Sequence, residues 1–216
     1  MASSTQSDSF AVARQMMADT QLRARGIRDE RVLEAMARVP RHKFVAENYR
    51  SQAYEDHPLP IGEDQTISQP YIVALALQAL TLEPSDTVLE VGSGSGYQTA
   101  LLAELSARVY SVERHAALAK AAQAILSDLG YRNVTVMIGD GAAGLQVHSP
   151  FDAIIVSAAT PEIPPILLQQ LREGGRMVVP VGPPDAQELQ LVRKHEGKAA
   201  ITVLEGCRFV PLVTGN

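Results

Sequence analysis

The segment VLEVGSGSGYQTA, residues 88–100, decides the fold of this chain. A short apolar strand is followed by three glycines within five residues and then by a helix-forming stretch. Glycine lets the backbone turn sharply and approach a ligand closely, and the free N–H groups of a helix N-terminus attract anionic groups. This unit predicts a parallel α/β sheet with a ligand bound beyond the carboxyl ends of its strands.

The rest of the chain after this segment repeats the alternation of short apolar strands and helical stretches, which is typical of βαβ units. The expected strands lie at 87–91, 108–112, 134–138, 152–158 and 176–181, and the expected helices lie near 97–106, 115–129 and 162–173. Residues 188–194 and 199–213, joined by a turn, predict an antiparallel hairpin at the sheet edge. We therefore expect a doubly wound, mostly parallel, seven-stranded α/β sheet.

The part of the chain before the sheet has a helical pattern. One helix is expected over residues 8–25, ended by Gly26, and a second from the cap Asp29 to just before Pro40. A third helix is expected to begin at Pro70. We expect residues 1–83 to form a helical cap with an active-site lid, and residues 84–216 to form the cofactor-binding domain of one compact unit.

Composition limits the classes of function. The chain has 216 residues, of which 46% are hydrophobic, and a formal net charge of −5. Overall acidity argues against tight nucleic-acid binding, although residues 14–50 carry nine basic against five acidic side chains. The only cysteine is Cys207, so no intramolecular disulfide forms, and neither a signal peptide nor a membrane span is visible. We expect a cytoplasmic protein without a membrane or nucleic-acid partner.

Two acidic residues at strand ends refine the ligand. Glu113 ends the second strand, where a carboxylate accepts hydrogen bonds from ribose hydroxyls, and Asp140 ends the third, where it can take an adenine amino group. The dinucleotide pattern G-x-G-x-x-G fails, because its last position falls on Tyr97 or Thr99. The sequence therefore indicates an adenosine-containing ligand and disfavours a dehydrogenase.

Together, the glycine loop and the two strand-end acids resemble a class I S-adenosylmethionine-dependent methyltransferase. Over about residues 15–213 the chain more specifically resembles the protein-L-isoaspartate O-methyltransferases. The stretches that carry this resemblance are VPRHKFV at 39–45, LPIG at 59–62, QTISQPYIVA at 65–74, VLEVGSGSGYQTA at 88–100, SVER at 111–114, GDG at 139–141, FDAIIVSAA at 151–159, LREGGRMVVPVG at 171–182 and RFVPL at 208–212. The glycine loop marks only the superfamily, whereas QTISQP and RFVPL are far more specific.

The resemblance implies transfer of a methyl group from S-adenosylmethionine to the free carboxylate of L-isoaspartyl residues in damaged proteins, with S-adenosylhomocysteine as product. It implies no metal. Ser68 would be the residue of the active centre. The implied cofactor-binding residues are Thr66, Ser68, Gly92, Ser93, Gly94, Gly96, Glu113, Asp140 and Gly141. The implied substrate-binding residues are Ile61, Gly62, Val210, Pro211 and Leu212. The partners would be isoaspartyl-containing proteins and peptides, bound by a monomer.

Other interpretations remain open at this point. Ser68 stands two residues before Pro70 and could simply cap a helix, and RFVPLV could be a plain edge strand. A methyltransferase that acts on RNA or a small molecule is the main alternative function. A non-catalytic nucleotide-binding module is the second alternative.

One position departs from the family pattern. Asp64 stands where many relatives have glycine, and aspartate is among the few side chains that tolerate a positive φ. The adjacent pair Glu63 and Asp64 also places negative charge near a site that must admit a carboxylate. We therefore expect substrate binding to be weakened and sensitive to salt.

Overall fold

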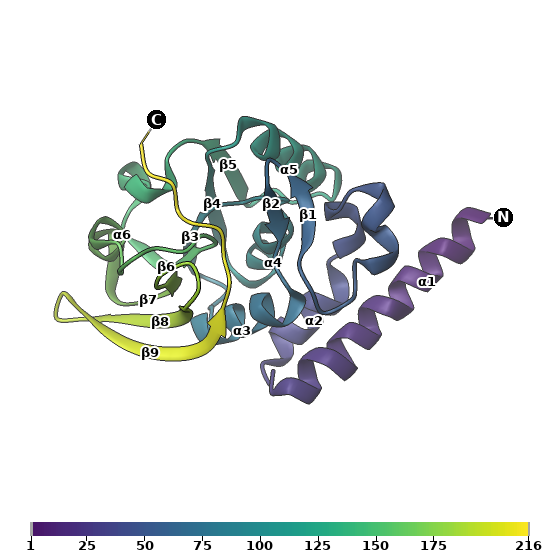
Figure 1. Cartoon of the computed structure of the whole chain (residues 1–216), viewed down its shortest axis with the longest axis horizontal. Helices are drawn as coiled ribbons and strands as arrows, with labels where there is room; N and C mark the ends of the chain where they lie inside the picture. The colour runs from purple at the N-terminus through teal and green to yellow at the C-terminus, as the bar shows by residue number, and fades with distance from the viewer. Residues whose placement is uncertain (1, 216) are drawn as a thin grey trace.

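The computed structural model describes residues 2–215, and its main feature is one seven-stranded sheet with helices on both faces (Figure 1). The strand order is β5-β4-β3-β6-β7-β8-β9. The strands are β3 (Thr87–Val91), β4 (Arg108–Glu113), β5 (Val134–Ile138), β6 (Phe151–Val156), β7 (Leu171–Val181), β8 (Gln187–His195) and β9 (Lys198–Cys207). The first five pair in parallel, and β7, β8 and β9 pair antiparallel. The predicted fold class is confirmed.

The helices and a separate small hairpin complete the fold. The hairpin consists of β1 (Leu59–Gly62) and β2 (Gln65–Ile67). The helices are α1 (Ala2–Met16), α2 (Glu30–Arg38), α3 (Pro70–Leu80), α4 (Tyr97–Leu105), α5 (Ala116–Asp128) and α6 (Pro165–Gln170), with short helical turns at Met17–Leu22, Arg23–Arg25, Arg41–Phe44, Glu47–Gln52, Gly141–Ala143 and Gln146–His148. Within the described residues, no helix is long and apolar enough to cross a membrane.

The sequence correctly predicts where the first N-terminal helical segment ends and where the second begins. Helical backbone continues from Ala2 through a π-helical turn and a 3₁₀ turn to Arg25, and Gly26 ends it with a φ of 96°. The Asp29 carboxylate accepts hydrogen bonds from the N–H groups of Arg31 and Val32, as expected of an N-cap. The start expected at residue 8 was wrong, because the helix begins earlier.

Two other predicted boundaries were wrong. The expected helix at 162–173 is only α6, since two consecutive prolines delay its start and Leu171 already pairs with Phe151 of β6. The last strand does not reach residue 213. It ends at Cys207. Just beyond, the Gln187 side-chain amide accepts the N–H of Phe209 and donates to its carbonyl, so these groups do not pair with a strand. Pro211 has no N–H with which to continue the ladder.

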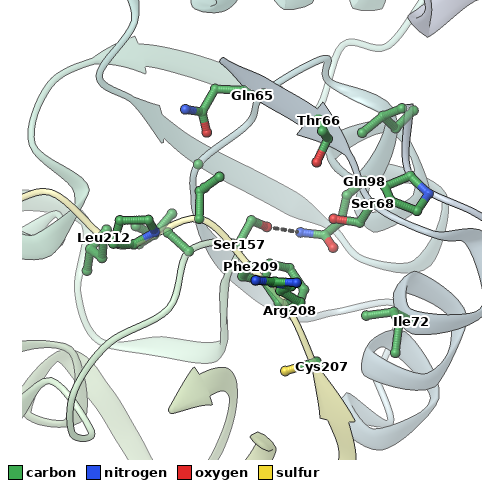
Figure 2. Close-up of a pocket in the computed structure, with 18 of the residues that line it drawn as sticks. Gln65, Thr66, Ser68, Ile72, Gln98, Ser157, Cys207, Arg208, Phe209 and Leu212 are labelled. Carbon is green, nitrogen blue, oxygen red and sulfur yellow. Dashed lines mark hydrogen bonds between the residues drawn. The ribbon is translucent and has the colours of Figure 1, made fainter. Parts of the chain in front are cut away.

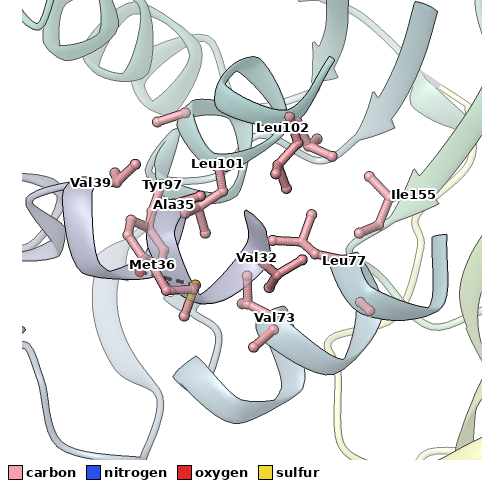
Figure 3. Close-up of a cluster of buried hydrophobic side chains, with 14 of the residues drawn as sticks. Val32, Ala35, Met36, Val39, Val73, Leu77, Tyr97, Leu101, Leu102 and Ile155 are labelled. Carbon is pink, nitrogen blue, oxygen red and sulfur yellow. Dashed lines mark hydrogen bonds between the residues drawn. The ribbon is translucent and has the colours of Figure 1, made fainter. Parts of the chain in front are cut away.

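The core on one face of the sheet joins the N-terminal helices to the central strands. Figure 3 shows α2, α3 and α4 contributing side chains to a single cluster that also includes Ile155 of β6. Adjacent residues in each strand point to opposite faces, so Val88 belongs to this cluster and Leu89 to the one beneath α6. The cap and the sheet therefore share a continuous hydrophobic core, which fixes the segment between them.

A buried ion pair fastens the end of α3 to β7. The Arg176 guanidinium donates to Asp86 Oδ2 at 2.6 Å and to the carbonyls of Leu80 and Thr81 at 2.8 and 3.1 Å. Only 7% of the Arg176 side chain and 4% of the Asp86 side chain are exposed. Removal of either partner would leave a buried charge without compensation.

Replacement of Asp86 by alanine is therefore expected to lower the free energy of unfolding by about 3–5 kcal/mol. The matched control is Arg172→Ala, which breaks the half-exposed pair with Asp152 and is expected to cost less than about 1 kcal/mol. Urea unfolding followed by circular dichroism measures both values. Equal losses of unfolding free energy in the two variants would show that the buried pair contributes no more to stability than the half-exposed pair.

Candidate functional site

A cavity of ≈ 740 Å³ lies at the carboxyl ends of the central strands (Figure 2). Its walls come from the lid hairpin β1–β2, the glycine loop after β3, the ends of β4 and β6, and the segment that follows β9. Ten predicted site residues line it: Thr66, Ser68, Gly92, Ser93, Gly94, Glu113, Gly141, Val210, Pro211 and Leu212. Residues widely separated in the sequence thus meet around one space.

The glycine loop needs its glycines for two different reasons. Gly92 and Gly94 line the cavity with φ values of 90° and 50°, a region that favours glycine. A Cβ at Gly94 would lie 3.2 Å from Cδ1 of Ile61, so the hairpin β1–β2 packs directly against this loop. Gly96 does not line the cavity. Its own Cβ would lie 3.0 Å from Cβ of Ala122, so this glycine lets α4 pack closely against α5.

Ser93 provides a polar group that no residue of the described chain satisfies. The residue is 5% exposed, and its hydroxyl has no hydrogen-bond partner among residues 2–215. A buried hydroxyl without a partner is costly, and it stands here in a cavity beside the N-terminus of α4. The loop is therefore suited to a ligand that carries a carboxylate.

The two strand-end acids have different surroundings. Each oxygen of Glu113 accepts one backbone N–H, from Gly94 and His115, both at 2.9 Å, so the carboxylate is fixed at the cavity wall and keeps lone pairs for further donors. Asp140 does not line the cavity. Its oxygens accept the N–H groups of Ala142 and Gly215 at 2.9 Å, and only the neighbouring Gly141 reaches the cavity.

The lid hairpin turns at the acidic pair. Glu63 and Asp64 have φ values of 52° and 55° between paired strands, the conformation of a type I′ turn. Asp64 therefore adopts the positive φ that aspartate is among the few side chains to tolerate. The Glu63 carboxylate lies 3.6 Å from Nδ1 of His115, so this acid of the pair has a partner next to the glycine loop. Ile61 and Gly62 belong to β1 and do not line the cavity, whereas Thr66 and Ser68 do.

The residue that holds the end of the lid was missed from the sequence. Arg41 is fully buried, and its guanidinium donates to the carbonyls of Ser68 and Ala53, both at 2.8 Å. It also lies over the ring of Tyr97, at 4.8 Å from the ring centre. Burial lowers the pKa of Arg41 to about 10, so it stays charged at neutral pH. The only signal was its place in VPRHKFV.

The segment after β9 is fixed against the end of β6. The N–H of Ala159 donates to the carbonyl of Val210 at 2.8 Å, and the N–H of Leu212 donates to the carbonyl of Ala159 at 2.7 Å. These bonds bring the predicted substrate residues to the cavity. Arg208, which was not predicted, also lines it (Figure 2).

A buried carboxylate stands behind the cavity wall. Glu90 of β3 is 0% exposed and accepts hydrogen bonds from Gln98 and Thr99 of α4 and from Ser111 of β4. Gln98 also donates to the hydroxyl of Ser157, and both of these residues line the cavity. A glutamate inside the apolar stretch VLEV was the available sequence signal, because such a group needs buried donors.

The pKa of Glu90 makes stability depend on pH. Desolvation raises this pKa from 4.5 to about 7, while the bonds from Ser111, Thr99 and Gln98 oppose the shift. The stabilising contribution of the bound proton is complete below about pH 4.5 and is lost as pH rises through about 7. From about pH 5 to 8 the parent should therefore lose about 3 kcal/mol of unfolding free energy relative to Glu90→Gln. Urea unfolding across this range measures the difference, and parallel profiles would refute it.

Known proteins of one family match this chain over nearly its whole length. The family profile described as Protein-L-isoaspartate(D-aspartate) O-methyltransferase matches residues 13–216. A protein-L-isoaspartate O-methyltransferase of Koribacter versatilis is 57% identical over 216 residues, which are 100% of this chain and 97% of the relative. A relative from Syntrophobacter fumaroxidans, named protein-L-isoaspartate O-methyltransferase 1, is 56% identical over 204 residues, 94% of this chain and 95% of its own.

The fold also agrees with solved structures. A Plasmodium falciparum structure described as a protein-L-isoaspartate O-methyltransferase, in complex with S-adenosyl-L-homocysteine, matches with a TM-score of 0.81 at 29% identity, over 93% of this chain and 98% of the other. Another solved protein-L-isoaspartate O-methyltransferase matches with a TM-score of 0.84 at 31% identity, over 94% of this chain and 66% of the other. The chain therefore belongs to the protein-L-isoaspartate(D-aspartate) O-methyltransferase family.

Proposed function

We infer that this protein transfers a methyl group from S-adenosylmethionine to the free carboxylate of L-isoaspartyl residues in damaged proteins, the first step of repair through a succinimide. The observation that carries this inference is the family match over residues 13–216, joined to a cavity in which Ser68, the glycine loop and the segment after β9 face one space. An RNA or small-molecule methyltransferase is not favoured, because the full-length relatives share the isoaspartyl-directed name.

The cofactor would bind on the glycine-loop side. We propose that Gly92, Ser93 and Gly94 hold its methionine portion, where the unpartnered Ser93 hydroxyl and the N-terminus of α4 suit a carboxylate. Glu113 would accept the ribose hydroxyls, and Asp140 with Gly141 would lie at the adenine. Thr66 and Ser68 would close over this side. Gly96 remains a proposed cofactor residue, but it would act through the shape of the loop, because it packs against α5 and does not line the cavity.

The substrate would bind between the lid and the segment after β9. We propose that Val210, Pro211 and Leu212 form one wall of the peptide cleft, with Ile61 and Gly62 on the lid. The Ser68 hydroxyl would donate to the isoaspartyl carboxylate and position it. Ser68 serves as a donor because a free serine hydroxyl without an adjacent base is a poor nucleophile. Its main chain is held for this by Arg41.

The reaction asks little of the protein beyond placement. A carboxyl group with a pKa near ~4 is ionised at neutral pH, so no general base is required. When bound, S-adenosylmethionine supplies a methyl group already activated on its sulfonium sulfur. The residues around the cavity therefore act by aligning the carboxylate and by excluding water.

Four further features are our proposals. The division into a cap with the lid (1–83) and a cofactor domain (84–216) is supported by the position of the cavity between the lid hairpin and the strand ends. The net charge of −5 supports the absence of a nucleic-acid partner, and the single cysteine supports a cytoplasmic location. We also propose that the enzyme acts as a monomer.

The direct test uses paired peptides that differ only in an isoaspartyl or aspartyl residue. The protein is incubated with each peptide and with S-adenosylmethionine labelled in the methyl group. Label is expected in the isoaspartyl peptide alone. Label in neither peptide would overturn the assignment, and equal label in both would remove its specificity.

The charge on the lid gives a second prediction. The carboxylate of Asp64 carries negative charge on the lid, so Asp64→Gly is expected to lower the Michaelis constant for an isoaspartyl peptide by about twofold at low salt and by less at high salt. Asp64→Asn is the matched control, because asparagine also tolerates a positive φ but carries no charge. A decrease with glycine alone would assign the effect to backbone strain. No change in either variant would refute the charge effect.

A further inference from the structure

Ser157 occupies the point where the two sides of the cavity meet. It directly follows β6, and its N–H donates to the carbonyl of Val91 at 2.9 Å, which holds it beside the start of the glycine loop. Its Cβ would lie 3.5 Å from a Cβ on Gly92. Two residues later, Ala159 is bonded to Val210 and Leu212 of the proposed peptide cleft. A group at Ser157 therefore lies between the cofactor side and the substrate side.

The direction of the Ser157 hydroxyl is set by the buried network. Gln98 Nε2 donates to Glu90 Oε1 at 3.0 Å and to Ser157 Oγ at 2.8 Å, the dashed line in Figure 2. In the structure, the amide of Gln98 presents the same nitrogen to Glu90 and to Ser157, so its NH₂ group donates to both. Ser157 Oγ is thus an acceptor toward Gln98. Its own proton has no acceptor among residues 2–215 and is available to the cavity.

We propose that Ser157 is a substrate-binding residue whose hydroxyl donates to the isoaspartyl carboxylate, and that Gln98 is a positioning residue that fixes the direction of this donation. The proposal rests on the proposed function and adds a second donor to Ser68. A carboxylate offers about four lone-pair sites, so it accepts from both serines and keeps a lone pair for the methyl group. Figure 2 shows Ser157 joined to Gln98 by the dashed line, and Ser68 lines the same cavity.

The chemistry of the acceptor supports a substrate rather than a cofactor contact. On the cofactor side, the unpartnered hydroxyl of Ser93 is already available for the methionine carboxylate. A donor to an anion is about twice as strong as a donor to a neutral group. Methylation turns the anionic acceptor into a neutral ester, so the same hydroxyl binds the substrate more tightly than the product. Ser157 thereby favours product release as well as substrate binding.

The test compares peptide binding with cofactor binding. Titration calorimetry measures the dissociation constant of an isoaspartyl peptide for protein saturated with S-adenosylhomocysteine, and separately that of S-adenosylhomocysteine alone. Ser157→Ala is expected to weaken peptide binding by about tenfold and to leave S-adenosylhomocysteine binding within about twofold. Ser157→Thr keeps the hydroxyl and is expected to restore peptide binding.

A double-mutant cycle tests the role of Gln98. Gln98→Leu is expected to weaken peptide binding in the parent and to have little further effect in Ser157→Ala, because both changes remove one interaction. Ser111→Ala is the matched control: it removes a different donor to Glu90, is expected to lower stability, and should leave peptide affinity unchanged.

Each outcome decides between distinct explanations. Loss of S-adenosylhomocysteine affinity in Ser157→Ala equal to the loss for the peptide would assign Ser157 to the cofactor and overturn the proposal. Unchanged peptide affinity, or additive effects of Gln98→Leu and Ser157→Ala, would also overturn it. A parent protein that does not distinguish isoaspartyl from aspartyl peptides would refute the proposed function itself. Parent activity with a fully active Ser157→Ala would refute only the inference on Ser157.

Discussion

The need to satisfy one buried carboxylate organises the centre of this protein. Glu90 lies in the middle strand of the parallel sheet with 0% exposure, and a carboxylate in that place requires donors from its neighbours. Those donors come from α4 and β4, so one side chain ties the strand, the following helix and the adjacent strand into a fixed relation. The glycine loop connects β3 to α4, so the same hydrogen bonds also fix the two ends of this loop. The position of the loop thus depends on a buried group that does not line the cavity.

A second buried charge serves the lid in the same manner. Arg41 lies outside the sheet, in a helical turn of the cap, and uses its guanidinium to hold the carbonyl of Ser68. Its stacking on Tyr97, the first residue of α4, links the cap to the helix that follows the glycine loop. The two buried groups therefore contact neighbouring residues in the first turn of α4. A shared helix couples the position of the lid to the position of the loop.

Sequence reasoning found the features whose chemistry is local. The glycine loop and Glu113 follow from the positions of strand ends, which a single segment expresses. The tolerance of Asp64 for a positive φ follows from its residue type. Arg41 and Gln98 were missed because their partners lie far along the chain: Ser68 is 27 residues from Arg41, and Ser157 is 59 residues from Gln98. Each looked like an ordinary polar residue in a helical stretch. The end of β9 was missed for a similar reason. The Gln187 side chain, which binds the backbone of Phe209 in place of a strand partner, comes from β8.

Pro211 gives the segment after β9 an unusual outer edge. Its parallel bridge to Ala159 uses the groups of Val210 and Leu212 on the inner side, so the outward-facing position is Pro211, which is exposed and has no N–H. That edge can accept a hydrogen bond but cannot extend a ladder. A sheet edge with unpaired N–H and C=O groups is a template for pairing with another chain. Pro211 removes the N–H group that such pairing would need at this point of the edge.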